Sequence, residues 1–541
     1  MIENIAQTLE NISQHYTSKV GLIEAKTKQS YTFGEIRDFA NSYGAYLKEQ
    51  GVKPGDRVML MVKPSVDFIS LTFALFKIGA PVILIDPGMG YRNLIRCIAS
   101  VKPDYLVGIP PVIVLKQMFR NTFRSVKKSF CCGNFPLLPV NNIQTTRAKE
   151  HVDVPVFQPD DNSLAAIIFT TGSTGPPKGV RFEHKIFSKQ LALIKHYYHI
   201  GPDDVDQPGF PLFGLFTIAM GACAVIPDMD PTKPALVDPA KFIDSIQRYQ
   251  VSYSFGSPAI WNVVSRYCIQ NDIKLHSLKK VLMAGAPVPG NLIQRVLDSS
   301  SDSAEVHTPY GATESLPIVS GDGREIISET WPMTQQGYGT CVGRVLPDIE
   351  VRIIEPADYL FNSIDDCVIK QVNEVGEIIV KGDVVTRAYD NNDAENRFSK
   401  IKDGSSFWHR IGDVGYFDEK KRLWFCGRKA HIVNGPHGPM YTIKCEAIAN
   451  NHPEVFRSAL VGIQGKNKEH AEPVLIIEKE QHSTTEDAAL LKEVKLLTQK
   501  NKNTEYISHF LIHPSFPVDI RHNAKIFREQ LQRWAEGKIG N

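Results

Sequence analysis

The sequence lacks several features that would place it in well-known protein classes. Its 541 residues contain nine cysteines but no Cys-x-x-Cys pair, so we expect reduced thiols and neither a disulfide framework nor a zinc site. The N-terminal stretch MIENIAQTLENISQHY has no basic start followed by an apolar core, which argues against a signal peptide. The longest apolar run, residues 214–227, is too short to cross a bilayer. We therefore expect a cytoplasmic protein with no integral membrane segment.

The chain also lacks a charge excess. It carries 61 Lys+Arg against 59 Asp+Glu, a formal net charge of +2, which gives no global attraction to nucleic acid or to an anionic membrane. We expect no nucleic-acid partner. A hydrophobic fraction of 43% can build a large core and excludes a disordered chain. The length predicts two to four folded units.

The first part of the chain alternates predicted helices and short apolar strands. A buried helix within residues 66–80 precedes the strand PVILIDP, and a helix over 93–100 precedes a strand over 105–109. The same order recurs later: a helix over 241–249, strands over 251–255 and 279–283, a helix over 291–297 and a strand over 305–308. This alternation predicts an α/β fold with two doubly wound sheets.

The pattern changes after about residue 340. Residues 344–355, 377–381 and 423–426 alternate apolar and polar side chains, which predicts a small β-barrel-like subdomain over 340–427. A mixed pattern returns after residue 428 and predicts a small α+β domain. We therefore expect an N-terminal domain over 1–427 and a C-terminal domain over 428–541.

The most informative motif is IIFTTGSTGPPKG, which ends at Gly179. An apolar strand runs into small hydroxyl residues and glycines, which let backbone N–H groups approach a phosphate closely. The spacing is not that of a Walker loop. The alternative, a flexible linker, explains neither the preceding strand nor the following Pro-Lys-Gly. The predicted phosphate-binding residues are Thr170, Thr171, Gly172, Ser173, Thr174, Gly175 and Lys178.

Two further motifs follow predicted strands. YGATE, which ends at Glu314, comes after the strand over 305–308. A carboxylate at the carboxyl end of a strand lies where open α/β sheets bind ligands, and it suits Mg²⁺ that is held mainly by phosphates. The turn Ala284–Pro287 follows the strand over 279–283 and could admit a flat base. Each motif alone is also compatible with an ordinary surface turn.

Three elements lie downstream. Asp413, in WHRIGD, could hold a ribose diol. Arg428 supplies a cation where the pattern changes. Lys525 lies in the segment PVDIRHNAK before the last predicted helix; taken alone, it would be read as a surface lysine.

Together these motifs resemble, in order and spacing, the acyl-adenylate-forming superfamily of acyl-CoA synthetases, luciferases and adenylation domains. The resemblance extends from about Tyr31 to Lys525. It implies ATP and Mg²⁺ as cofactors, Glu314 and Thr170 at the metal, Lys525 as the catalytic lysine of a mobile C-terminal domain, and Arg428 at the start of the hinge. The implied nucleotide-binding set also includes Gly285, Ala286, Pro287, Tyr310, Gly311, Ala312, Thr313 and Asp413.

Departures from the superfamily pattern narrow the resemblance. Ala524 replaces the glycine that usually precedes the catalytic lysine, Ala430 replaces the usual hinge residue, and the segment PLFGLF lacks the histidine common in acyl-CoA synthetases. The loop Gly435–Thr442 also differs from the pattern of CoA-using members. These variants resemble the olefin-biosynthesis β-lactone synthetases.

That resemblance implies ATP-dependent activation of a long-chain 2-alkyl-3-hydroxy acid and its closure to a β-lactone, with a thiolase, a reductase and a β-lactone decarboxylase as pathway partners. His522 or His437 could remove the hydroxyl proton. The alternatives are a fatty acyl-CoA ligase and a non-catalytic nucleotide-binding scaffold. The presence of Lys525, Glu314 and Asp413 argues against the scaffold.

Overall fold

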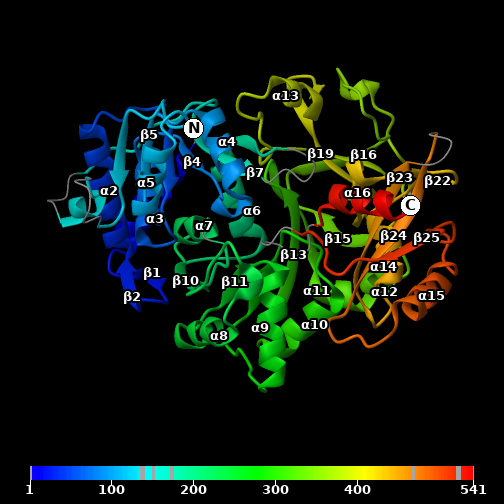
Figure 1. The fold of residues 1–541 in the computed structure, drawn as a ribbon. Helices are drawn as coiled ribbons and strands as arrows, with labels where there is room; N and C mark the ends of the chain where they lie inside the picture. Colours follow the sequence, from blue (N-terminus) through cyan, green and yellow to red (C-terminus); the bar gives the residue numbers. More distant parts are fainter. Residues whose placement is uncertain are drawn as a thin grey trace.

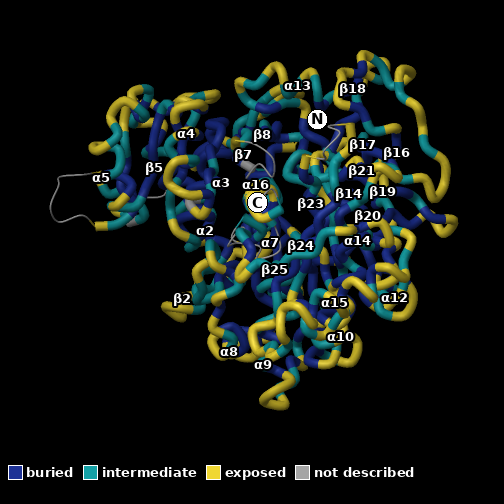
Figure 2. Tube along the Cα trace, turned by 45° about the vertical axis from the view of Figure 1, so that its right-hand side comes forward, coloured by how far each residue is buried: buried dark blue, intermediate teal, exposed yellow. Residues whose placement is uncertain are grey.

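The computed structural model describes residues 3–134, 141–148, 153–170, 176–210, 212–464, 469–518 and 526–539. The chain forms a large N-terminal sheet domain and a smaller C-terminal domain (Figure 1), as the sequence predicts. Figure 2 shows that buried residues concentrate in the sheets and in the helices packed on them. In the part of the chain that the structure describes, no helix is long and apolar enough to span a membrane. All nine cysteines are free.

The first sheet has six strands in the order β6-β5-β3-β4-β7-β8, parallel except for the β7–β8 pair. Its side chains alternate between two hydrophobic clusters. Val58 packs with α2 and α3 on one face, and Met59 packs with α4 and α5 on the other. The elements are α1 (Ile5–His15), α2 (Phe33–Glu49), β3 (Val58–Met61), α3 (Val66–Lys77), β4 (Val82–Leu84), α4 (Tyr91–Val101), β5 (Tyr105–Gly108), α5 (Pro110–Met118), β6 (Lys128–Cys131), β7 (Leu164–Thr170) and β8 (Lys178–Glu183).

The second sheet combines parallel strands with an antiparallel edge. Strands β1, β10, β9, β11, β12 and β13 pair in parallel, as the helix–strand alternation predicts. The strands of this sheet up to β14, and the helices between them, are β1 (Val20–Glu24), β2 (Gln29–Thr32), α6 (His184–Tyr197), β9 (Val205–Asp206), α7 (Phe213–Ala219), β10 (Cys223–Ile226), α8 (Pro239–Arg248), β11 (Tyr253–Gly256), α9 (Pro258–Gln270), β12 (Lys280–Met283), α10 (Gly290–Ser299), β13 (Glu305–Ala312) and β14 (Ser315–Asp322).

The β-rich region after residue 340 is antiparallel, as expected, but its strands continue the second sheet. Strand β15 pairs with β14 at Val319↔Val345 and with β20 on its other side, so hydrogen bonding runs unbroken from the parallel strands into this region. The elements are α11 (Gly323–Glu325), α12 (Trp331–Gln335), β15 (Thr340–Val345), β16 (Ile349–Ile354), β17 (Gly376–Gly382), α13 (Asp393–Ser399), β18 (Lys400–Asp403), β19 (Ser406–Phe417) and β20 (Leu423–Arg428).

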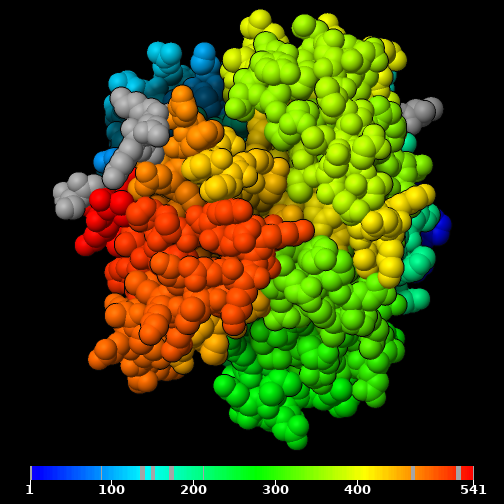
Figure 3. Space-filling view, turned by 90° about the vertical axis from the view of Figure 1, so that its right-hand side faces the viewer, coloured from blue at the N-terminus to red at the C-terminus, as the bar shows by residue number. Residues whose placement is uncertain are grey.

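The C-terminal domain has its own small sheets and packs beside the β-rich region (Figures 1 and 3). Three side-chain amides attach it to the large domain: Asn451, Asn501 and Asn503 donate to the backbone carbonyls of Gln335, Gln336 and Gly337. Its elements are β21 (Val433–Gly435), β22 (Gly438–Met440), α14 (Thr442–Ala449), β23 (Val455–Gln464), β24 (Ala471–Lys479), α15 (Asp487–Thr498), β25 (His509–Ile512) and α16 (Arg528–Ile539).

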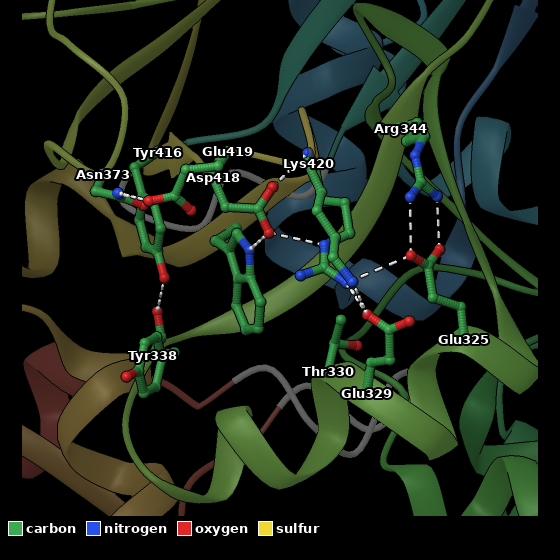
Figure 4. A network of polar contacts seen from close by, with 12 residues as sticks. Glu325, Glu329, Thr330, Tyr338, Arg344, Asn373, Tyr416, Asp418, Glu419 and Lys420 are labelled. Atoms are coloured by element: carbon green, nitrogen blue, oxygen red, sulfur yellow. Dashed lines mark hydrogen bonds and ion pairs between the residues drawn. The ribbon is translucent and has the colours of Figure 1, made fainter.

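A charged network joins the β19–β20 turn to the segment before β15 (Figure 4). Arg422, whose side chain is 5% exposed, donates to Asp418 at 2.7 Å and to Glu329 at 2.9 Å. Trp424 donates to the same Asp418 oxygen at 2.9 Å. Arg344 pairs with Glu325 at the edge of the network and is 51% exposed. The network therefore contains one buried and one exposed arginine.

We predict that Arg422→Met lowers the free energy of unfolding by about 3–5 kcal/mol, because Asp418 would keep a buried charge without its cation. The matched variant Arg344→Met should cost about 1 kcal/mol or less, because its ion pair is open to solvent. Urea denaturation followed by tryptophan fluorescence measures both. Equal losses of unfolding free energy in the two variants would show that burial does not determine how much each arginine stabilises the protein.

Candidate functional site

The predicted site residues that the structure describes converge on one cavity of about 1990 Å³. They come from both sheets and from the β-rich region, and they meet at the carboxyl ends of parallel strands, where open α/β sheets bind ligands. The predicted residues that line the cavity are Lys178, Gly285, Ala286, Pro287, Tyr310, Gly311, Ala312, Thr313, Glu314, Asp413 and Arg428.

Some predicted residues cannot be placed. Thr171, Gly172, Ser173, Thr174, Gly175, His522 and Lys525 lie outside the described residues, and so does the side chain of Thr170. The residue after Lys525 is described: Ile526 lines the cavity, as does Arg528. Arg528 is fixed by a two-pronged ion pair with Glu446, at 2.6 and 2.9 Å. The roles of the unplaced residues stay predictions.

The YGATE motif lies partly on a strand. The sequence predicted that the strand ends before it, whereas β13 continues through Ala312 and turns back into β14. Gly311 permits this tight hairpin, because a Cβ there would lie 2.4 Å from the backbone oxygen of Ser315. Glu314 therefore sits in the turn between two paired strands. The turn after β12 likewise needs its glycine, since Gly285 has a φ of +94°.

Tyr310, Asp413 and Arg428 form a polar cluster in the cavity wall, in which Asp413 is buried and the Arg428 side chain is 36% exposed. The Tyr310 hydroxyl donates to Asp413 at 2.6 Å, and Arg428 forms an ion pair with Asp413 at 3.0 Å. The Asp413 carboxylate raises the pKa of Arg428, and burial together with Asp413 raises the pKa of Tyr310 well above its usual value. Strand pairing places Asp413 directly opposite Arg428 across β19 and β20. The cluster is thus charged and preorganised.

Glu314 has a partner that sequence reasoning missed. The Tyr389 hydroxyl donates to Glu314 Oε1 at 2.7 Å, across 75 residues of chain. The Lys178 ammonium lies 5.3 Å from the centre of the Tyr389 ring and pairs with Glu395 at 2.5 Å. Tyr389 therefore touches both the predicted metal carboxylate and the predicted phosphate-loop lysine. No sequence signal marks Tyr389, because its two contacts come from residues far away in the sequence.

Hydrogen bonds with three other segments of the chain fix the backbone around Tyr389. The carboxylate of Asp390 accepts two hydrogen bonds from Arg57, both at 2.9 Å. The backbone N–H of Thr386 donates to the carbonyl of Glu314 at 2.8 Å, and Lys400 donates to the carbonyl of Thr386. Burial lowers the pKa of Lys400 to about 7, although Glu314 and Glu183 act in the opposite direction. These contacts fix the side chain that supports Glu314.

Aromatic side chains line another part of the cavity. Phe213 stacks on Phe255 with ring centres 3.8 Å apart, and Phe187, Phe216 and Tyr253 complete what we call the aromatic chamber. Phe213 comes from the segment PLFGLF, in which the sequence has no histidine. The chamber is continuous with the cavity wall that carries Glu314, so the site pairs a polar half with an apolar half.

Two histidines differ in their relation to the cavity. His437 stacks on Tyr506 with ring centres 3.8 Å apart and is not among the lining residues. His431 does line the cavity, beside Glu529 at 3.3 Å. Burial and the nearby Arg528 lower the pKa of His431 to about 4, so its imidazole is neutral at neutral pH and is a weaker base than a free histidine.

The described residues fit a magnesium ion held mainly by a nucleotide. Among them there is no group of three or more histidine, cysteine, aspartate or glutamate side chains that could hold a metal. The carboxylate of Glu314 lines the cavity, and one of its oxygens accepts a hydrogen bond from Tyr389. Mg²⁺ commonly binds through one or two carboxylates together with substrate phosphates, and that arrangement suits this donor set.

Comparisons with known proteins agree with the motifs. Residues 9–390 match the AMP-binding enzyme family. The chain is 39% identical over 515 residues to an olefin beta-lactone synthetase from Xanthomonas campestris pv. campestris, covering 93% of this chain and 90% of that protein. It is 38% identical over 510 residues to the olefin beta-lactone synthetase of Stenotrophomonas maltophilia, covering 92% and 90%.

The fold agrees as well. The structure is similar to that of the amide bond synthetase McbA from Marinactinospora thermotolerans, with a TM-score of 0.82 at 20% identity over 98% of this chain and 99% of that one. The resemblance predicted from the motifs is thus confirmed by sequence matches over most of the chain. The chain belongs to the AMP-binding enzyme family.

Proposed function

We propose that this protein uses ATP to activate a long-chain 2-alkyl-3-hydroxy acid as an acyl-adenylate and closes the adenylate to a β-lactone, releasing pyrophosphate and AMP. The observation that carries the proposal is the continuity of the cavity, which joins the charged wall around Glu314 and Asp413 to the aromatic chamber. An acid whose carboxylate meets the nucleotide while its hydrocarbon is buried needs such a site. The names of the two relatives supply the product class.

In the first half-reaction, a carboxylate oxygen of the acid attacks the α-phosphate of ATP. A new C–O–P anhydride forms and the bond to pyrophosphate breaks. Both reactants are anionic, so cations must offset their repulsion. Lys178 and Lys525 would supply positive charge near the phosphates, and Asp413 would accept hydrogen bonds from the ribose hydroxyls. A magnesium ion held by Glu314, with Thr170 as a second proposed ligand, supplies further neutralisation when bound.

In the second half-reaction, the substrate's own 3-hydroxyl oxygen attacks the activated carbonyl carbon. The ring C–O bond forms, the bond to AMP breaks, and the hydroxyl proton passes to a base. His522 stays the proposed base. Holding the hydroxyl against the carbonyl makes the step intramolecular, and this proximity helps to offset ring strain.

We further propose that residues 428–541 move as a unit about Arg428, with residues 1–427 as the stationary part. The contacts that attach the smaller domain at Gln335, Gln336 and Gly337 are amide–carbonyl hydrogen bonds. Ile432 and Tyr441 add apolar contacts with the cluster formed by β15, β19 and β20. Relative motion is expected of such interfaces within a chain unless they are large and hydrophobic. Such motion would bring Lys525 to the nucleotide for one half-reaction and withdraw it for the other.

Three experiments test the proposed function. The first concerns the metal. We predict that Glu314→Gln slows adenylate formation about a hundredfold or more at low Mg²⁺, because the amide keeps the shape but loses the charge, and that raised Mg²⁺ partly restores the rate. Pyrophosphate release measures turnover, and calorimetric titration of ATP with and without Mg²⁺ measures binding. Kinetics unchanged at every Mg²⁺ concentration would refute the role.

Tyr389 gives a finer test of the same carboxylate. Tyr389→Phe should raise the Mg²⁺ concentration needed for half-maximal ATP binding by about tenfold, as is typical for partners of metal ligands. In the Glu314→Gln background the same change should add little, because the two residues act as one unit. Tyr416→Phe is the matched control, since its hydroxyl donates to the carbonyl of Tyr338 at 3.0 Å in a different region. Additive effects of the two substitutions would exclude coupling.

The second experiment concerns the catalytic lysine. Lys525→Ala should reduce pyrophosphate release on the order of 10²–10³-fold while ATP binding and the fold remain, because one cation at the reacting phosphate is lost. Lys538→Ala, an exposed lysine on α16 of the same domain, serves as the control. Wild-type rates in the Lys525 variant would overturn the assignment.

The third experiment identifies the product. With ATP and Mg²⁺, 3-hydroxy acids should give AMP and a lactone without any thiol, and CoA should not accelerate AMP release. A simple fatty acid without the 3-hydroxyl should stall as a bound adenylate, because no internal group reaches the carbonyl. Mass spectrometry of the products decides. An acyl-CoA thioester as the main product would support the acyl-CoA ligase instead, and no adenylate with any acid would support a nucleotide-binding scaffold.

A further inference from the structure

The cavity extends beyond the aromatic chamber to the carboxyl edge of the first sheet. Strands β3 and β5 are neighbours there, but their connections lead away in opposite directions. The chain leaves β3 through α3, which packs in one hydrophobic cluster, to reach β4, and it leaves β5 through α5, which packs in the other cluster, to reach β6. Such a topological switch point opens a crevice outside the strand ends, and this is where α/β sheets bind ligands.

The crevice at this switch point is lined by apolar side chains, with Lys63 and Asp86 beside them at the same strand ends. Five lining residues, which define the switch-point lobe, are Met61, Ile85, Ile109, Val112 and Phe169. They belong to or pack against the cluster that includes α4 and α5, whereas Phe187, Phe213, Phe216, Tyr253 and Phe255 of the aromatic chamber belong to or pack against the cluster that includes α2 and α3. One cavity therefore reaches two separate apolar regions.

The cavity is large enough for a ligand that carries more than one hydrocarbon chain, each of which is called an arm below. Its volume of about 1990 Å³ is about twice the upper end of the range of roughly 300–1,000 Å³ found for small-molecule pockets. The nucleotide would occupy the charged wall, and one hydrocarbon chain would occupy the aromatic chamber. The switch-point lobe then offers a second apolar surface next to the same reaction centre.

We propose that the switch-point lobe binds a second hydrocarbon arm of the acid, so that a substrate with alkyl arms on C2 and C3 places one arm in each apolar region. The inference rests on the proposed function, which supplies the branched acid. Arms on adjacent carbons diverge from the carboxyl group, so a single tunnel cannot bury both. The enzyme thereby selects α-branched acids over single-chain acids.

The test narrows the lobe and varies the two arms independently. Ile109→Phe adds a ring at the lobe, and Leu115→Phe is its matched control, because Leu115 is also half-buried on the same cluster but does not line the cavity. Each variant is assayed for pyrophosphate release and for lactone formation with two series of acids. In the first series the C2 arm is a methyl, medium or long chain and the C3 arm is fixed; in the second series the C3 arm varies and the C2 arm is fixed. Thermal unfolding and ATP binding report on the fold.

We expect Ile109→Phe to lower kcat/KM about tenfold or more for acids with two long arms, since several methylenes lose their burial. If shortening the C2 arm or the C3 arm to a methyl group removes this loss of kcat/KM, the shortened arm is the one that the lobe binds. Leu115→Phe should behave as wild type with every acid. Met61→Ala, which enlarges the lobe, should shift the preference towards a longer version of the same arm.

Two results would overturn the inference. One is an Ile109→Phe variant that is folded, binds ATP and shows no dependence on either arm. The other is an equal loss with every acid together with weaker ATP binding, which would assign the lobe to the nucleotide. Both are distinct from failure of the proposed function, in which the wild-type protein makes no lactone from any 3-hydroxy acid.

Discussion

The pairing of β19 with β20 is the constraint on which the cavity depends. It sets Asp413 opposite Arg428, and Tyr310 on β13 donates a hydrogen bond to the same carboxylate. Asp413 is 4% exposed, so its charge is tolerated only while both partners are present. The same pairing ends at Arg428, just before the segment that leads into β21. One polar cluster thus joins the cavity wall to the β-rich region.

The second constraint is the contact between Tyr389 and Glu314. A hydrogen bond at 2.7 Å fixes one oxygen of a carboxylate that would otherwise rotate freely in a turn. Arg57 secures the segment from the first sheet through Asp390, so the support for Glu314 draws on both sheets. A carboxylate held this way can meet a metal–nucleotide complex without first losing side-chain entropy.

The cavity is divided chemically as well as spatially. Charged and hydrogen-bonding groups gather at the ends of β12, β13, β19 and β20, while aromatic and aliphatic groups are concentrated beside α7 and at the edge of the first sheet, where Lys63 and Asp86 also line the cavity. An amphipathic acid would be oriented by this division alone, because burying its carboxylate among the phenylalanines is costly and solvating its hydrocarbon is unfavourable. Orientation of this kind supports the proposed intramolecular closure, which depends on a fixed approach of hydroxyl to carbonyl.

The sequence by itself determined the α/β alternation, the change to antiparallel strands after residue 340, and the family. Local periodicity and short motifs carry this information: a strand before TTGSTGPPKG, a carboxylate in YGATE and a glycine at Gly285 are each visible within a few residues. It did not determine that β13 runs through Ala312, since that depends on pairing with β14. Nor did it reveal Tyr389, Lys400 or the switch-point lobe. Their roles come from contacts between residues far apart in the chain, and only the tertiary structure decides which strand ends and loops meet.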